Sequence, residues 1–373
     1  MALADYIQLI NTENIGPITF YKLVEQFGTV ENAIKSLPQK FKLFPRKDAE
    51  REIKLAESKN IRIITYDSPE YPERLKQLED APPVLYVLGN INLLNHHLSL
   101  SIVGARNASI NGRKTASKIA YDLSNNDILI ISGMARGIDS SAHLGAMYAK
   151  EQQGATLAVL GTGIDIIYPK ENTDLYEKII RQGVIVSEFP IGTDPQSTNF
   201  PRRNRIVSAL SDGTLVVEAT VNSGSLITAR LALEQGKDIF AIPGSPNDAR
   251  ALGPNKLIKE GAILVESADD ILETLVTNNK KQIKPLPKNT KVNKPKKQTV
   301  DNQPSFVAMN TSANEGDKSD ILDYLSHSGI DIDELIRISG LDSQTLSLKL
   351  FELEFAGIIE RQAGNKVALI GRR

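Results

Sequence analysis

The sequence predicts an α/β protein whose centre is a Rossmann-like, doubly wound and mostly parallel sheet. Apolar runs alternate with helical patterns from about residue 61 to 277, and this alternation is typical of parallel sheets. Residues 1–60 contain helical patterns separated by short breaks, whereas residues 315–373 combine helical patterns with a hairpin pattern. We therefore expect an N-terminal helical domain, an α/β core and a C-terminal winged-helix-like domain.

Composition limits the classes of function. A chain of 373 residues accommodates two or three domains, and 41% hydrophobic residues suffice for a sizeable core. The formal net charge of −1 places any nucleic-acid surface in a local patch. The absence of cysteine excludes disulfides, thiolate zinc sites and cysteine nucleophiles. The first residues lack a signal-peptide pattern and no apolar run approaches about 20 residues, so we expect a cytoplasmic protein without a membrane partner.

A glycine-centred turn at Asn14–Pro17 separates two apolar helical faces in the N-terminal domain, residues 1–60. This pattern is typical of a helix–hairpin–helix or SAM-like unit, which binds phosphate backbones without sequence preference. Lys22 is the one basic residue near the turn. A helical domain with a packing role alone is therefore an equal alternative.

The core, residues 61–277, contains apolar runs with the length and content of buried strands. Helical patterns separate most of them, for instance Gly112–Leu123, Ser140–Lys150, Leu175–Gln182 and Ser225–Glu234. The predicted strands are Ile61–Thr65, Val84–Leu88, Leu100–Val103, Ile128–Ile131, Thr156–Leu160, Val184–Val186, Leu215–Val217, Ile239–Ile242 and Ile263–Val265.

Residues 278–314 are predicted to be an extended linker. Eight lysines lie between Lys280 and Lys297, with several prolines and no acidic residue. We interpret the segment as a flexible tether, with added affinity for phosphates as the alternative.

Residues 315–373 have the plan of a winged helix. Ten acidic residues stand against three basic ones between Glu315 and Glu354, which opposes contact with DNA phosphates. We interpret this domain as a protein-contact module, with DNA reading as the alternative. Its predicted elements are helices at Asp317–Ser326, Asp331–Ile338 and Asp342–Phe355 and a hairpin of Ile358–Arg361 with Lys366–Ile370.

The segment from Asn199 to Arg205 carries the strongest local signal. Asn199 and Phe200 are expected in a loop, and Pro201 pre-sets the start of a helix. Arg202, Arg203 and Arg205 crowd the first turn, where the helix dipole is already positive. A bound anion explains them most simply; a surface helix with solvated arginines is the alternative.

Further candidates follow other predicted strands. Gly104-Ala105-Arg106 comes after one strand, and Ser132-Gly133-Met134-Ala135-Arg136-Gly137 forms a glycine-rich turn before a helix. Such a turn suits an anion, although it is also ordinary in this fold. Lys170 and Asn172 follow a third strand. Because carboxyl ends of parallel strands share one edge, we expect convergence on a polyanion, for which nucleic acid is the natural candidate.

Signatures of enzymes and cofactors are poor. The chain lacks a phosphate-binding GxxxxGK[ST] loop, a complete dinucleotide fingerprint and a GxSxG elbow. Its four histidines, at positions 96, 97, 143 and 327, show no metal-ligand spacing. We therefore predict no catalytic residue, no cofactor and no metal.

These motifs together resemble the DprA/Smf family of bacterial DNA-processing proteins. The resemblance covers about residues 60–275, and the flanking domains agree with it. Its carriers are Gly104-Ala105-Arg106, Ser132 to Asp139, Tyr168-Pro169, Asn199 to Ile206, Ser223-Gly224-Ser225-Leu226-Ile227-Thr228-Ala229 and Ala241-Ile242-Pro243-Gly244.

The resemblance implies a dimeric protein that binds single-stranded DNA and loads the RecA recombinase onto it in natural transformation. Ala105 stands where the family commonly has serine, which removes a hydroxyl from the expected phosphate pocket. The residues expected to contact the strand are Gly104, Ala105, Arg106, Ser132, Gly133, Ala135, Gly137, Lys170, Asn172, Phe200, Arg202, Arg203, Asn204, Arg205, Ser223, Gly224 and Ser225.

Two alternatives come from other classes. The fold also resembles nucleotide phosphoribohydrolases, in which Glu218 would serve as a base after Gly213-Thr214, but their Pro-Gly-Gly motif is missing and the spacing is one residue longer. A winged-helix transcription regulator would rest on the acidic C-terminal domain alone.

Overall fold

The computed structural model describes residues 3–149 and 155–282, together with parts of the C-terminal region between residues 330 and 369. The chain divides into two compact units, Met1–Lys288 and Asn289–Arg373. Among the described residues, no helix combines the length and apolar character that a membrane crossing requires.

A nine-stranded sheet forms the centre of the first unit, and the α/β prediction is confirmed. Seven strands, β3 to β9, are parallel to their neighbours, and β1 and β2 join antiparallel at one end beside β6. The spatial order is β1-β2-β6-β5-β4-β3-β7-β8-β9. The strands are β1 (Arg62–Thr65), β2 (Val84–Gly89), β3 (Ser99–Val103), β4 (Leu129–Ser132), β5 (Thr156–Val159), β6 (Val184–Ser187), β7 (Gly213–Val216), β8 (Asp238–Ala241) and β9 (Ile263–Leu264).

Helices cover both faces of this sheet. On one face, apolar residues of α5 (Ile110–Asn125), α6 (Ile138–Met147) and α11 (Ala268–Gln282) pack on strand residues such as Leu100 and Ile102. On the other, α8 (Asn199–Leu210) and α9 (Gly224–Glu234) pack on residues that include Val103 and Ile131. The two faces alternate along each strand, as the pleat requires.

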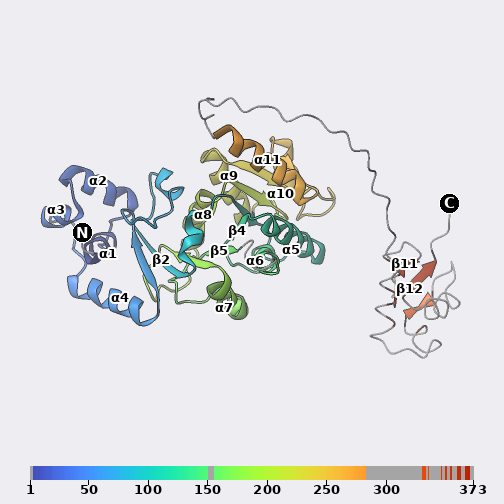
Figure 1. The fold of residues 1–373 in the computed structure, drawn as a ribbon, viewed down its shortest axis with the longest axis horizontal. Helices are drawn as coiled ribbons and strands as arrows, with labels where there is room; N and C mark the ends of the chain where they lie inside the picture. The colour runs from blue at the N-terminus through green and yellow to red at the C-terminus, as the bar shows by residue number, and fades with distance from the viewer. Residues whose placement is uncertain are drawn as a thin grey trace, which may run out of the picture. The chain divides into compact units, whose positions relative to one another are not determined.

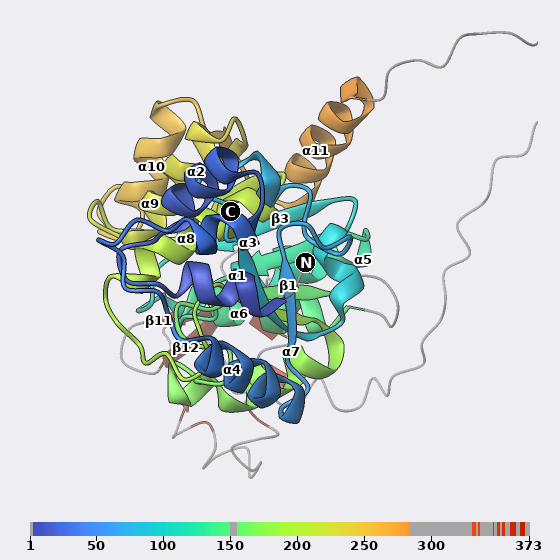
Figure 2. The same cartoon turned by 90° about the vertical axis from the view of Figure 1, so that its left-hand side faces the viewer.

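The N-terminal helices gather at the β1–β2 end of the sheet, as Figure 1 shows in blue and Figure 2 shows from the front. Their apolar side chains share a core with α7 (Thr173–Gln182) and with β2, β5 and β6. Helix α10 (Leu252–Lys259) lies toward the other end. The N-terminal helices are α1 (Leu3–Ile10), α2 (Pro17–Phe27), α3 (Val30–Lys35) and α4 (Arg46–Ser58).

Among the boundaries that differ from the predictions, two change how a segment is interpreted. Helix α8 begins at Asn199, so Asn199 and Phe200 belong to its first turn and not to a loop. Pro201 is then the third helical residue, where a missing N–H is still tolerated. Helix α11 ends at Gln282, inside the segment predicted as linker.

The described residues of the second unit include a small antiparallel sheet of β10 (Ile330–Asp331), β12 (Lys366–Leu369) and β11 (Ile359–Gln362). The β11–β12 pairing agrees with the predicted hairpin. Leu335, Leu346 and Leu350 are buried with Ile359 and Val367. The predicted linker from residue 283 onward and the helix predicted at Asp317–Ser326 lie outside the described residues.

His143 on α6 is fully buried under the sheet. Its Nδ1 lies 2.6 Å from the Thr156 hydroxyl, and Nε2 has no protein partner among the described residues. Burial, with a smaller contribution from the positive charge of Arg203, lowers the pKa of His143 to about 3. His143 is therefore neutral in the folded protein, as expected of a structural histidine.

We predict that His143 makes folding stability fall with acidity. The unfolded chain binds this proton near pH 6.5 and the folded chain only near pH 3, so stability is lost as the pH falls below about 6.5. Between pH 7 and 5 the loss amounts to about 2 kcal/mol. Urea unfolding of the wild type and of His143→Gln at both pH values measures it; an equal pH dependence in both proteins would contradict the assignment.

Candidate nucleic-acid interface

A pocket of about 900 Å³ opens at the carboxyl edge of β3 and β7. Here the chain reverses its direction of winding, since β4, β5 and β6 lie on one side of β3 and β7 to β9 on the other. Open α/β sheets bind ligands at this switch point. Of the predicted residues, those that line the pocket are Gly104, Ala105, Arg106, Gly133, Ala135, Phe200, Arg203, Asn204, Ser223, Gly224 and Ser225.

Helix α8 presents one face to this pocket. Phe200, Arg203, Asn204 and Val207 line it, and their spacing of three and four residues places them on one side of a helix. The first turn of α9, Ser223–Ser225, lines it too. The pocket thus receives the starts of two helices, where the helix dipole attracts anions.

A cation and two aromatic rings form a stack at the pocket. The guanidinium of Arg106 lies 5.6 Å from the centroid of the Phe200 ring, and that ring lies 5.4 Å from the ring of Tyr168. Gly161 makes room for the stack, because a Cβ there would lie 2.8 Å from the Phe200 ring. Arg106 and Tyr168 are exposed, so the stack offers solvent a charge and an aromatic face.

Arg203 is buried beside this stack and is held by the protein itself. Its Nη1 donates to the carbonyl oxygens of Gly133, at 2.7 Å, and of Val159, and its Nε donates to Asn204 at 3.1 Å. A Cβ on Gly133 would lie 2.4 Å from the guanidinium, so the glycine accommodates Arg203. Burial lowers the pKa of Arg203 to about 10, which leaves it positively charged at neutral pH.

The glycine-rich turn after β4 holds an internal anion. The carboxylate of Asp139 accepts from the N–H groups of Gly133, at 3.2 Å, and Ala135, at 3.3 Å. Burial raises the pKa of Asp139, and Arg203 and these two N–H groups oppose that rise. The predicted anion-binding turn therefore binds the carboxylate of Asp139, and these two N–H groups do not point to an external anion.

Two further residues of that turn have structural contacts. The buried hydroxyl of Ser132 donates to the carbonyl oxygen of Ile102 at 2.6 Å. Gly137 has φ +79°, and a Cβ on it would lie 2.3 Å from the carbonyl oxygen of Ala105. Both residues lie outside the pocket lining, contrary to the expected convergence.

Arg202 and Arg205 point away from the pocket. Arg205 is buried, with Nη2 2.7 Å from Glu188 and Nε 2.9 Å from Asp80. Arg202 is 54% exposed, lies 3.8 Å from Glu188, and lines a separate groove of about 410 Å³ that includes Gly16 of the N-terminal hairpin. The crowded arginines of α8 therefore have internal partners, and a bound anion is not needed to explain them.

Lys170 and Asn172 lie beyond the pocket, in the segment between β5 and α7. Lys170 is exposed, two residues after Tyr168. The side-chain amide of Asn172 donates to the carbonyl oxygen of Met134 at 2.8 Å, which links this segment to the glycine-rich turn. Lys170 remains available to a ligand that extends along the edge, whereas Asn172 is engaged.

Glu218, the residue of the enzyme alternative, is also engaged. Its carboxylate accepts from the N–H of Ser109 at 2.8 Å and from the Ser109 hydroxyl at 2.5 Å. A Cβ on Gly112 would lie 2.4 Å from the same carboxylate. Glu218 thus fastens the end of β7 to the start of α5, and it is not among the pocket-lining residues.

The prediction from sequence missed Tyr168, Asn107 and Arg250, which also line the pocket. Tyr168 could have been found, because an aromatic residue before a proline follows a predicted strand. Arg250 lies between two strands without a recognisable motif. With Arg106 and Arg203 it gives the lining three arginines against one acidic residue, Asp139.

Fold and site together define an α/β protein with a pocket lined by arginines and aromatic rings at the switch point of its sheet. The family model of DNA recombination-mediator protein A matches residues 62–276. A DprA-like N-terminal HHH domain matches residues 2–62, and a DprA winged helix domain matches residues 308–365. The chain therefore belongs to the DprA/Smf family of DNA recombination mediators, which confirms the resemblance.

Similar proteins match this chain over different shares of its length. Protein Smf of Escherichia coli K12 is 44% identical over 238 residues, which cover 64% of this chain and 63% of that protein. Protein Smf of Synechocystis is 32% identical over 94% of this chain and 95% of its own. The solved DprA of Streptococcus pneumoniae has a TM-score of 0.63 at 33% identity, covering 74% of this chain and 99% of its own.

A solved DprA of Helicobacter pylori, studied for its mode of binding single-stranded DNA, has a TM-score of 0.53 at 30% identity. The match covers 58% of this chain and 97% of that one.

We predict that Arg203 is needed for folding. Arg203→Met leaves the carboxylate of Asp139 buried without its compensating charge. It also removes the hydrogen bonds to the carbonyl oxygens of Gly133 and Val159. Removal of one partner of a buried charged pair costs about 3–5 kcal/mol. Urea unfolding monitored by circular dichroism measures the difference.

Arg202→Met is the matched control, since Arg202 is the exposed neighbour on the same helix. Substitutions at such surface positions usually change stability by within about 0.5 kcal/mol. Equal stability of the two variants would contradict the structural role of Arg203.

Proposed function

We propose that this protein binds single-stranded DNA at the switch-point pocket and delivers it to the RecA recombinase during natural transformation. The observation that carries the proposal is the stack of Arg106, Phe200 and Tyr168 beside the starts of two helices. Such a stack meets both parts of a nucleotide, because cations and N–H groups bind phosphate and aromatic rings stack on bases. A duplex offers no free base faces to such rings.

Phosphate contacts set the register of the strand in this proposal. Arg106 is an exposed cation of the pocket, and Lys170 extends the same edge beyond Tyr168. Buried Arg203, whose charge is balanced by Asp139, contributes by holding the helix that carries Phe200. Stacking on Phe200 and Tyr168 adds about 1–3 kcal/mol per base and little sequence preference.

A mediator role needs no bond chemistry. The engaged carboxylate of Glu218 argues against the phosphoribohydrolase alternative, in which it would be the base. The acidic C-terminal domain argues against a transcription regulator and favours a contact with protein. A homodimer remains a prediction that rests on the family resemblance, and a cytoplasmic location remains one that rests on the missing signal-peptide pattern and the lack of a long apolar run.

We predict that Arg106→Glu lowers affinity for single strands by at least tenfold with the fold intact, because attraction to a phosphate becomes repulsion. The slope of log affinity against log salt concentration should flatten by about 0.7 for each phosphate that the variant no longer neutralises. Fluorescence anisotropy of a labelled oligothymidine over a salt series measures both quantities, and a labelled duplex should bind more weakly.

Arg181→Glu is the control for this experiment. Arg181 is 68% exposed in the last turn of α7, just before β6 begins, so it lies at the opposite edge of the sheet. Its charge reversal should leave affinity nearly unchanged. Equal weakening in both variants would mean that total charge and not the pocket controls binding.

We predict that the full chain accelerates RecA filament assembly on strands coated with single-strand-binding protein. Phosphate contacts are numerous and individually weak, so a held strand can pass to a filament. Arg106→Glu should lose the acceleration and still associate with RecA, because the pocket and the protein contact are separate surfaces. Fluorescently labelled RecA follows assembly; no acceleration by the wild type over RecA alone would refute the mediator role.

A further inference from the structure

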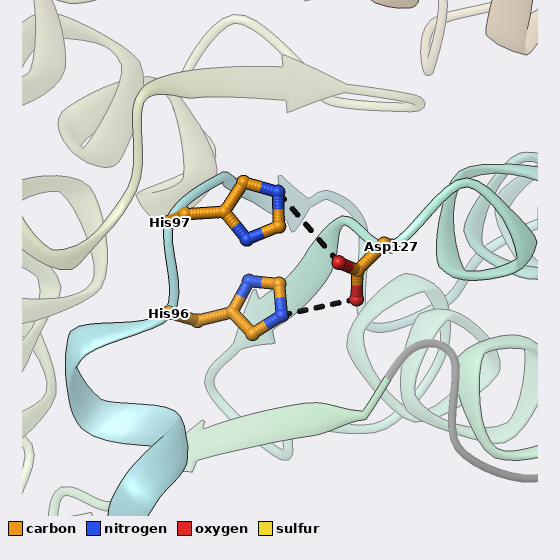
Figure 3. Close-up of side chains that lie close together, drawn as sticks. All are labelled: His96, His97 and Asp127. Atoms are coloured by element: carbon orange, nitrogen blue, oxygen red, sulfur yellow. Dashed lines mark hydrogen bonds and ion pairs between the residues drawn. The ribbon is translucent and has the colours of Figure 1, made fainter.

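We propose that His96, His97 and Asp127 form a binding site for a divalent transition-metal cation of the zinc class. The three side chains come from two loops, before β3 and before β4, and converge at the amino-terminal edge of the sheet. Figure 3 shows both imidazole rings directed at the carboxylate. The site is independent of the switch-point pocket, which lies at the carboxyl ends of the strands.

The separations fit a single ion. His96 Nε2 lies 3.2 Å from Asp127 Oδ1, and His97 Nε2 lies 3.7 Å from Asp127 Oδ2. One ligand atom from each residue can be chosen so that all lie within 4.8 Å of one another. With bonds of about 2.0–2.2 Å, two ligands of a tetrahedral ion lie about 3.4 Å apart. Small side-chain rotations therefore suffice to place one cation between the three groups.

A hydrogen bond from one ring nitrogen to a carbonyl oxygen orients His96, as is usual for histidines that bind a metal through the other nitrogen. Its Nδ1 lies 2.9 Å from the carbonyl oxygen of Leu98, which makes Nδ1–H the donor. The lone pair of Nε2 then points at the Asp127 carboxylate, an acceptor. A cation between Nε2 and the carboxylate joins these two acceptors, and either a proton or a metal ion can fill that position. The same Leu98 oxygen accepts the N–H of Leu129, so one carbonyl oxygen both orients the ring and links the two segments.

The backbone of the histidine pair is held rigidly. Arg74 donates through Nη1 to the carbonyl oxygen of His96, at 2.6 Å, and through Nη2 to that of His97, at 2.9 Å. Arg74 is itself fixed by Asp212 at 2.8 Å, and Asp212 accepts the N–H of Ser99 at 2.9 Å. Ligands that are positioned in advance bind a metal with less loss of conformational freedom.

Exposure fits a site with open positions. The side chains of His96, His97 and Asp127 are 16%, 61% and 50% exposed. Three protein ligands and one water would complete a tetrahedral zinc ion. Asp127 has φ +58°, a left-handed conformation that asparagine also tolerates well. Asp127→Asn is therefore a substitution that changes the ligand and keeps the loop.

The test is calorimetric titration of the tag-free full chain with Zn²⁺, together with the visible spectrum of the Co²⁺ form. We expect one ion per chain, with His97→Ala and Asp127→Asn each weakening binding by at least tenfold. Asp122→Asn makes the same chemical change on α5, and His327→Ala removes a histidine of the C-terminal region; both should bind as the wild type does.

Three outcomes would overturn the proposal. They are no heat of binding at micromolar Zn²⁺, affinity that survives both ligand substitutions, and affinity that disappears in His327→Ala. Circular dichroism of each variant identifies loss of folding. If only one ligand variant fails to fold, the other decides the outcome; if both fail, the Co²⁺ spectrum decides, because nitrogen and oxygen ligation in a tetrahedral field gives absorption that an aquo ion lacks.

Discussion

The guanidinium of Arg203 is the group on which the architecture of the site depends. It crosses from α8 to the carboxyl edge of the sheet and donates to β5 and to the turn after β4. A buried carbonyl oxygen that loses its donor costs about 1–3 kcal/mol. The same charge compensates Asp139, and Asp139 in turn holds the N–H groups of that turn. One side chain therefore joins β4, β5, α6 and α8.

This arrangement explains the residues around it. Gly133 must lack a side chain because the guanidinium occupies that space, and His143 stays neutral partly because Arg203 is near. The helix that carries Arg203 also carries Phe200, three residues earlier and on the same face. Anchoring the helix internally thus fixes the ring against Gly161 and under Arg106. Buried Arg203 therefore positions Phe200, which is the partner of Arg106, and Arg106 itself stays exposed to solvent.

The sequence was sufficient to predict the fold and about half of the residues that line the pocket. Apolar runs such as Thr156–Leu160 and Val184–Val186 predicted strands correctly, because a strand that is buried on both faces needs a short, continuous apolar sequence. Arg106 was predicted because it follows a strand end, and Phe200 because it precedes the arginines of α8. Arg202 and Arg205 were assigned to the pocket because sequence shows charge but not direction: their partners, Glu188 and Asp80, approach from other elements. Asp139 accepts hydrogen bonds from the N–H groups of Gly133 and Ala135, six and four residues earlier. The sequence alone did not show that this turn binds an internal carboxylate.

His96 and His97 also show that sequence does not reveal which distant residues meet in the fold. Spacing rules for metal ligands work when the ligands share one helix or hairpin, but Asp127 follows His97 by thirty residues and only the parallel pairing of β3 with β4 brings them together. The sheet thus has two edges with different chemistry. At its carboxyl edge, helix starts and arginines favour an anion, and at its amino edge, imidazoles and a carboxylate favour a cation. Helices that connect parallel strands start at the carboxyl edge of the sheet and end at its amino edge. Their dipoles therefore place positive potential at the first edge and negative potential at the second.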